Sequence, residues 1–196
     1  MTGRGSARSV IVEAALSSAR ESGWDGTSMQ DVRLRAGVSN GSLFHHFPTR
    51  QDLESAVVAA GLLDHDAVVL AALDAAAGAR EGVRDVVLRH LAWVADNPRI
   101  ALLLLSASPA VLREAVPAAV TEDNRRLFAE VADWLRGHGW GGKPALPVVT
   151  ALWLGPANEV ARGWLIAGGG EPTGAVAAVV ADAAWHALRP HLGQGS

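Results

Sequence analysis

Residues 39–45 combine small and hydrogen-bonding side chains within a segment of about two helical turns. Asn40, Ser42 and His45 can donate and accept hydrogen bonds, and Gly41 lies among them. Such side chains are what a helix needs in order to hydrogen-bond base edges in a DNA groove. Gly41 costs about 1 kcal/mol in helix propensity. Close approach of the backbone to DNA, or close helix packing, would explain that cost equally well.

Other chemistries lack the residues that they need. The chain has no cysteine, which excludes disulfides, thiolate metal sites and a cysteine nucleophile. His45 and His46 are adjacent, so on a helix they point about 100° apart, and no carboxylate is suitably placed to complete a metal site. The glycines at 137–142 and 168–170 lack the spacing and the strand context of a phosphate-binding loop. We therefore expect no enzyme, no metal and no cofactor.

The elements that position residues 39–45 are predicted to be helices. Glycine and proline separate segments rich in Ala, Leu, Arg and Glu, without long alternating β-branched runs. We predict an all-α fold of about nine helices. The expected ranges are 10–22, 27 or 28 to 35, 40–46, 50–76, 81–96, 98–106, 118–137, 145–167 and 173–188, with a further short piece around 110–116.

The second and third of these helices form a predicted helix-turn-helix around residues 36–38. Ser39 caps the third helix, and Thr49 with Asp52 at the third helical position caps the fourth. Leu43 and Phe47 are predicted to point inward as anchors. A short turn containing glycine sets the second helix of such a pair at a steep angle, so that it can enter a major groove.

The charge distribution separates a head from a body. Residues 1–50 carry a formal charge of +2, whereas residues 51–196 carry −5. This split hints that only the head meets a polyanion, and the long fourth helix is expected to join the two parts near residue 50. Apolar runs such as 101–105 and 175–181 are far shorter than the roughly 20 residues of a membrane span. No signal peptide is recognisable, and we expect a cytoplasmic protein without a membrane partner.

Residues 27–53 read TSMQDVRLRAGVSNGSLFHHFPTRQDL, and this stretch resembles the DNA-binding signature of the TetR family of bacterial transcriptional regulators. The resemblance implies a DNA-binding domain at 1–50 and a ligand-binding and dimerisation domain at 51–196. It also implies contacts with an operator from three places: the start of the second helix, the third helix and the start of the fourth. The residues predicted to bind DNA are Thr27, Arg33, Ser39, Asn40, Gly41, Ser42, Phe44, His45, Thr49 and Arg50.

Three positions depart from the family pattern. Phe44 stands where the family usually has Tyr, so a hydroxyl contact to phosphate is lost. Arg33 replaces a small residue, and Ala19 replaces a large aromatic one whose loss Trp24 could offset. Taken singly, Arg33 and Arg50 can equally be solvated surface charges. Thr49 can act as a helix cap without any contact to phosphate.

Six of the seven Trp lie in the body, where large aromatics usually fill a core. The alternative is a pocket for an apolar or aromatic effector, lined by Trp93, Trp134 and Trp153. Its polar groups would be Asn158, Glu159 and Arg162, although the last two can simply pair with each other at i, i+3 spacing.

The last helix carries a stripe of small apolar residues that suits close helix packing. In the resembled family the last two helices form the interface of a homodimer. An intramolecular core face fits the pattern equally well. The resulting hypothesis is a ligand-responsive repressor that releases a palindromic operator when a small effector binds. The alternative is an effector-independent DNA-binding regulator or an interaction module.

Overall fold

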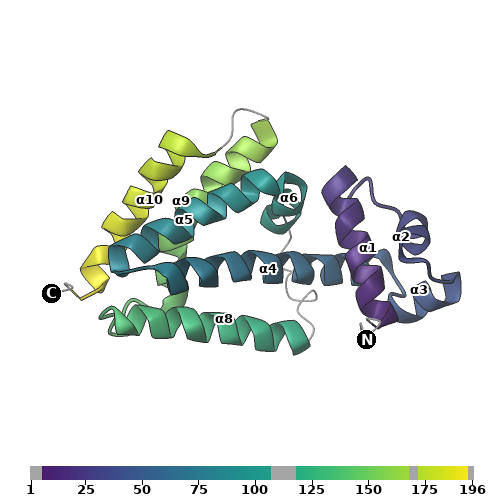
Figure 1. Cartoon of the computed structure of the whole chain (residues 1–196), viewed down its shortest axis with the longest axis horizontal. Coiled ribbons are helices and arrows are strands. Elements are labelled where there is room, and N and C mark those ends of the chain that lie inside the picture. The colour runs from purple at the N-terminus through teal and green to yellow at the C-terminus, as the bar shows by residue number, and fades with distance from the viewer. Residues whose placement is uncertain (1–5, 107–117, 168–171, 194–196) are drawn as a thin grey trace. The chain divides into compact units, whose positions relative to one another are not determined.

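The computed structural model describes residues 6–106, 118–167 and 172–193. At residues 118–124 it describes the backbone only. All regular structure in these ranges is helical, which confirms the all-α prediction, and helix ends agree with the predicted ones to within three residues. The predicted helix at 110–116 lies outside the described residues. The helices are α1 Ala7–Ser22, α2 Met29–Ala36, α3 Asn40–His46, α4 Arg50–Ala75, α5 Ala79–Asp96, α6 Pro98–Ser106, α8 Ala118–Gly137, α9 Leu146–Ala167, α10 Gly174–Leu188 and a 3₁₀ turn, η1, at Arg189–His191 (Figure 1).

Short polar side chains define the helix-turn-helix. Ser28, not Thr27, caps α2 by accepting a hydrogen bond from the Asp31 backbone, and Ser39 caps α3 in the same way. Gly37 follows α2 in the left-handed conformation with φ of 65°, which glycine adopts without steric cost. The caps and this glycine place α2 and α3 on either side of a three-residue turn.

The chain divides into two compact units, and the first comprises Met1–Leu63 with Asn97–Thr121. Within it α1 packs against α2, α3 and α6, and the side chains of Ile11, Val32 and Phe47 are buried. Trp24 and Ala19 are buried in this unit as well. α6 therefore packs with the N-terminal helices, although it follows the predicted head in sequence.

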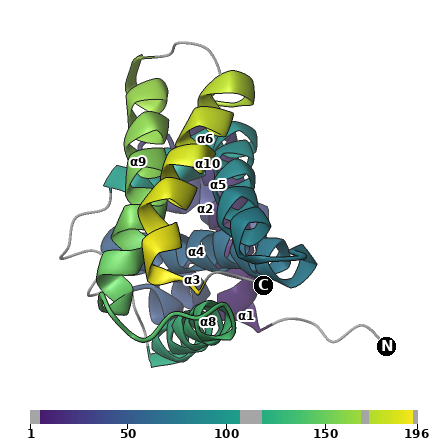
Figure 2. The same ribbon diagram turned by 90° about the vertical axis from the view of Figure 1, so that its left-hand side faces the viewer.

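The second unit comprises Asp64–Asp96 with Glu122–Ser196. Its centre is a layer in which α10 packs on both α5 and α9, and α5 packs on α9 (Figure 2). Leu91, Ala157 and Ala181 are fully buried in this layer. Small residues on α9 and α10 let the helices approach closely, as the stripe in the sequence indicated.

One described helix, α4, is long and apolar enough to cross a membrane by length and composition alone. Isolated polar residues break α4 into short apolar runs, while its mean hydropathy stays at 1.8. The core helix of a globular protein passes the same test, and 44% of that stretch is buried inside the molecule. The feature is weak evidence for a membrane span.

Candidate DNA-binding surface and ligand cavity

The exposed face of α3 carries the predicted base-reading residues. Asn40, Gly41, Phe44 and His45 are all exposed, whereas Leu43 is buried. Phe47, directly after the helix, is buried too, so both predicted anchors point inward. Burial of the anchors holds the helix on α1 and leaves its polar face uncovered within this unit.

Gly41 lies in open space. A Cβ atom built on it would have only the Ser39 hydroxyl as a neighbour, at 4.0 Å. Packing among the described residues therefore does not require a glycine here. Ser42 is half-buried, and its backbone N–H donates to the Ser39 hydroxyl over 3.1 Å.

Thr27 has a structural role in the free protein. Its side chain is only 4% exposed, and its hydroxyl donates to the Gly23 carbonyl over 2.8 Å. A hydroxyl has one proton to donate, so a contact from Thr27 to phosphate would require this bond to break. The sequence spacing did not reveal that the residue would be buried.

The start of α4 holds two further predicted contacts, and both make bonds within the chain. The Arg50 guanidinium donates to the Trp24 carbonyl over 2.6 Å and lies 4.7 Å from the centre of that indole ring. The Thr49 hydroxyl donates to the Asp52 carboxylate over 2.7 Å. Arg50 thus covers the buried Trp24 and Thr49 caps the helix, while both residues remain exposed.

On α2, two arginines differ in their surroundings. Arg35 donates to both carboxylate oxygens of Glu21 and to the Ser17 hydroxyl, which ties α2 to α1. That hydrogen bond lowers the pKa of Glu21 and raises the pKa of Arg35. Arg33 is half-exposed and has no hydrogen-bond partner among the described side chains, so its charge can reach an external anion.

Sequence reasoning missed two residues beside this surface. Leu34 on α2 is 60% exposed, an unusual position for a large apolar side chain next to polar ones. The Arg8 guanidinium at the start of α1 lies 5.2 Å from the centre of the Phe47 ring, which brings a cation close to the end of α3. The only signal in the sequence was a basic residue in the first helical turn.

The second unit contains a cavity of about 480 Å³ between α4, α5, α8 and α9. Most of its wall is apolar, including Val69, Phe128 and Leu154. Two of the six predicted ligand-binding residues, Trp153 and Asn158, are part of this wall. The polar groups that sequence reasoning did not place here are His65, Asp66 and Thr150.

The other four predicted ligand-binding residues lie outside the cavity wall. Trp134 packs against Trp153 with ring centres 6.0 Å apart. Glu159 and Arg162 form an exposed ion pair at 2.8 Å, which is the alternative to a role in the ligand pocket that their i, i+3 spacing allowed. Trp93 is buried, and its indole N–H donates to the Asp64 carboxylate over 3.2 Å. The body tryptophans therefore do not form one cluster, because those on α5 and α8 fill space between helices.

Two histidines meet beside the cavity. The Nε2 atom of His65 and the Nδ1 atom of His90 lie 2.8 Å apart, so one donates to the other. Burial, with a smaller contribution from His65, lowers the pKa of His90 to about 3. His90 is therefore neutral at physiological pH, and its Nε2 atom is buried without a partner in the described structure. Nowhere in the described ranges do three His, Asp or Glu side chains group closely enough to hold a metal ion.

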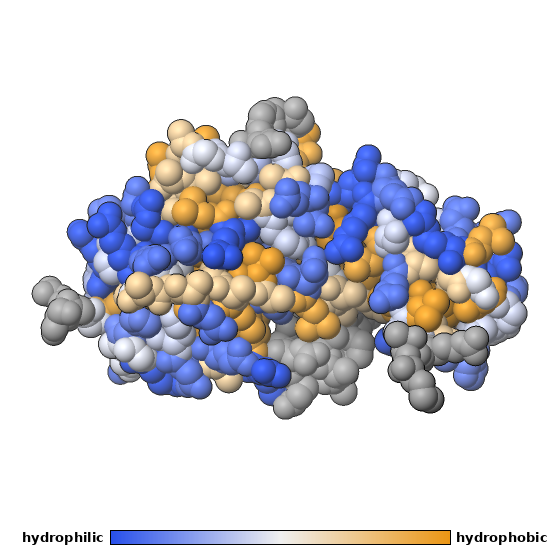
Figure 3. Space-filling view, viewed as in Figure 1, coloured by the Kyte–Doolittle hydropathy of each residue, from blue (hydrophilic) through white to orange (hydrophobic). Residues whose placement is uncertain are grey.

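α9 and α10 present exposed apolar side chains on neighbouring helices. Ile166 is 73% exposed and Val179 is 69% exposed, and Val148, Leu152 and Val176 are exposed as well. Hydrophobic residues are visible on the surface around these helices in Figure 3. Exposed apolar patches of this kind mark interaction surfaces. The stripe of small apolar residues on the last helix was open to two interpretations, a dimer interface or an intramolecular core face. In the structure, one edge of this stripe packs inward and another edge is exposed.

Two comparisons of the sequence with known proteins point to one family. Residues 11–57 match the family described as bacterial regulatory proteins, tetR family. An uncharacterized HTH-type transcriptional regulator of Bacillus subtilis, YezE, is 30% identical over 90 residues, which are 46% of this chain and 46% of that protein. The match thus spans about half the length of this curated relative.

Solved structures share the fold over nearly the whole chain. A tetR-family protein from Shewanella sp. PV-4 has a TM-score of 0.64 at 19% identity and covers 97% of this chain and 100% of its own. The fatty acid degradation regulator FadR from Bacillus halodurans has a TM-score of 0.67 at 14% identity, with 95% and 97% covered. FadR from Bacillus subtilis, solved with stearoyl-CoA, has a TM-score of 0.64 at 15% identity, with 92% and 97% covered. These likenesses establish the fold.

Proposed function

We propose that the protein is a DNA-binding transcriptional regulator of the TetR family, which its residues 11–57 match, and that it recognises its operator through α3. The observation that carries the proposal is the exposed face of α3, where Asn40 and His45 stand free of the core. Asn can hydrogen-bond adenine at two points in the major groove, and Gly41 leaves room for close approach. Arg33 and the positive end of the α2 dipole supply attraction to phosphate.

A homodimer would present two copies of α3 to a palindromic site. The exposed apolar side chains of α9 and α10, Ile166 and Val179 among them, support this part of the proposal because a second copy would cover them. The two recognition helices would then meet successive major grooves about 34 to 36 Å apart. Residues 1–50 would read DNA, and residues 51–196 would dimerise and bind ligand.

The cavity in the second unit supports an effector site, and its chemistry narrows the effector. Its wall is mainly apolar, with Asp66 and His65 on α4 and Thr150 and Asn158 on α9. Among the described residues, no Lys or Arg lines it. A small apolar or aromatic molecule that is neutral or positively charged therefore fits the described wall better than an anion does. Stearoyl-CoA, which was solved with the Bacillus subtilis protein, carries phosphates for which the described wall offers no cationic partner.

The effector would act through a difference in affinity between two arrangements of the protein. A ligand that binds more tightly to the arrangement with lower operator affinity lowers DNA binding by that difference and no more. In a cytoplasmic repressor this releases the operator. If the cavity binds nothing, the effector-independent DNA-binding regulator is the function that remains, and no ligand would shift the melting temperature.

The proposal is tested by selecting genomic DNA fragments with the purified protein at two salt concentrations and sequencing them. We expect one inverted-repeat site to survive the higher salt, because base contacts persist when phosphate contacts are screened. The double variant Asn40→Ala/His45→Ala should lose that site and keep its oligomeric state. Sequence-blind binding by the unmodified protein would contradict the proposal.

A further inference from the structure

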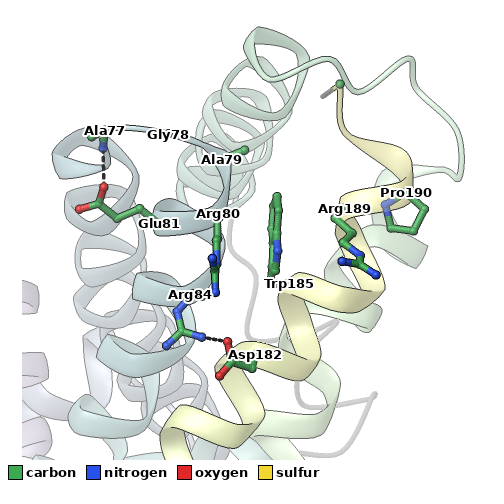
Figure 4. Close-up of a pocket in the computed structure, with 11 residues that line it drawn as sticks. Ala77, Gly78, Ala79, Arg80, Glu81, Arg84, Asp182, Trp185, Arg189 and Pro190 are labelled. Atoms are coloured by element: carbon green, nitrogen blue, oxygen red, sulfur yellow. Dashed lines mark hydrogen bonds and ion pairs between the residues drawn. The ribbon is translucent and has the colours of Figure 1, made fainter. Parts of the chain in front are cut away.

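A second hollow in the second unit lies between the start of α5 and the end of α10. This groove, of about 1060 Å³, is lined by residues 77–81 and by Arg84, Asp182, Trp185 and Arg189, together with Pro190 and Gly193 (Figure 4). It shares no lining residue with the cavity described above. The groove is thus a separate candidate site with its own chemistry.

The acidic side chains of the groove are already engaged. Asp182 forms an ion pair with Arg84. The Glu81 carboxylate accepts a hydrogen bond from the Ala77 backbone over 3.2 Å, and Figure 4 shows it turned away from Trp185. Arg80 and Arg189 are exposed, and neither has an ion-pair or hydrogen-bond partner for its guanidinium in the described part of the chain. The groove therefore carries three arginines against two carboxylates, and the guanidiniums of Arg80 and Arg189 are not engaged within the described structure.

Between these two cations the groove presents an aromatic surface. The Trp185 ring is half-buried and is seen edge-on in Figure 4, with Arg80 on one side and Arg189 on the other. Neither guanidinium lies over this ring within the roughly 6 Å of a cation–π contact. By contrast, Arg136 lies 5.9 Å from the centre of Trp140 in the same unit and pairs with Asp133. Trp185 thus keeps a face on which a flat molecule could stack.

We propose that this groove binds a small planar aromatic anion, with its ring stacked on Trp185 and its carboxylate paired with Arg80 or Arg189. A guanidinium matches a carboxylate through two parallel hydrogen bonds, and an indole favours offset stacking with a second ring. Asp182, Trp185 and Arg189 follow at i, i+3 and i+7, on one face of the helix. Val179 is about 60° from Asp182 in the other rotational sense, so Val179 and Trp185 lie about 120° apart around the helix.

The experiment is calorimetric titration of the full-length protein with 2-naphthoate and with 2-naphthamide, its neutral counterpart. We expect naphthoate to bind at least about tenfold more tightly, because a charge-assisted hydrogen bond contributes more than one neutral bond. Arg80→Ala/Arg189→Ala should remove that preference. Arg136→Ala is the matched control, since it deletes an arginine beside another tryptophan, and it should change nothing.

Two outcomes would overturn the proposal. One is equal affinity for the acid and the amide in the unmodified protein. The other is naphthoate binding that survives Arg80→Ala/Arg189→Ala but is lost in Phe128→Ala, which would assign the anion to the cavity under α8 and α9. Both substituted arginines are exposed, so the double variant should fold normally. No DNA is needed, and failure of operator binding would leave this test unaffected.

Discussion

At Gly41, one substitution should change the stability of the protein and its affinity for DNA in opposite directions. Because a Cβ atom there meets open space, Gly41→Ala should stabilise the free protein by about 0.5 to 1 kcal/mol through lower backbone entropy in the unfolded state. The same methyl group should weaken operator binding if DNA approaches the backbone closely. Urea unfolding and operator titration measure the two effects. Gly37→Ala is the contrasting variant, since φ of 65° there should make alanine destabilising.

His90 makes stability depend on pH. Its pKa is about 3 in the folded protein against 6.5 for an ordinary histidine, so the unfolded chain binds the extra proton between those values. Its contribution is complete above pH 6.5 and should fall by about 1.4 kcal/mol per pH unit as pH drops toward 3. Urea unfolding at pH 7.5, 6 and 5 measures the slope. His90→Gln should flatten it, and an unchanged slope in that variant would assign the pH dependence to other groups.

At the scale of the elements, one glycine allows α5 and α8 to pack together. A Cβ atom on Gly82 would lie 2.3 Å from a ring carbon of Trp134, which is closer than real contacts allow. We expect Gly82→Ala to destabilise the protein by about 1 to 3 kcal/mol, the usual cost of overpacking. Thermal unfolding compares it with Gly137→Ala, where nothing lies within 4 Å of the added atom. Adding Trp134→Leu should recover part of the loss, and strict additivity would argue against the clash.

At the scale of the whole molecule, the face formed by α9 and α10 should decide whether the protein is a dimer. Val179→Glu places a charge on a side chain that is 69% exposed in the single chain, so folding should be unaffected while self-association is lost. Sedimentation should give the mass of two chains for the unmodified protein and the mass of one chain for the variant. Leu34→Glu, at a side chain 60% exposed on α2, is the control and should remain a dimer.

Local signals determined most of the fold. The helix boundaries, the caps at Ser39 and Thr49, and the inward anchors Leu43 and Phe47 depend on neighbours three or four residues away, which a sequence displays directly. The same applies to the exposed polar face of α3, since alternate faces of a short helix can be assigned from its spacing. The resemblance over residues 27–53 could be recognised for the same reason, because its signature is continuous in sequence.

Contacts between distant segments were decided only by the tertiary structure. The bond from Arg50 to the Trp24 carbonyl and the pairing of His65 with His90 join residues whose separation in sequence carries no pattern. The same holds for the cavity: Trp153 and Asn158 line it, while Trp93 and Trp134 fill space between helices. Which side of a tryptophan meets solvent depends on where neighbouring helices lie. That placement is set by packing over the whole unit and not by local spacing.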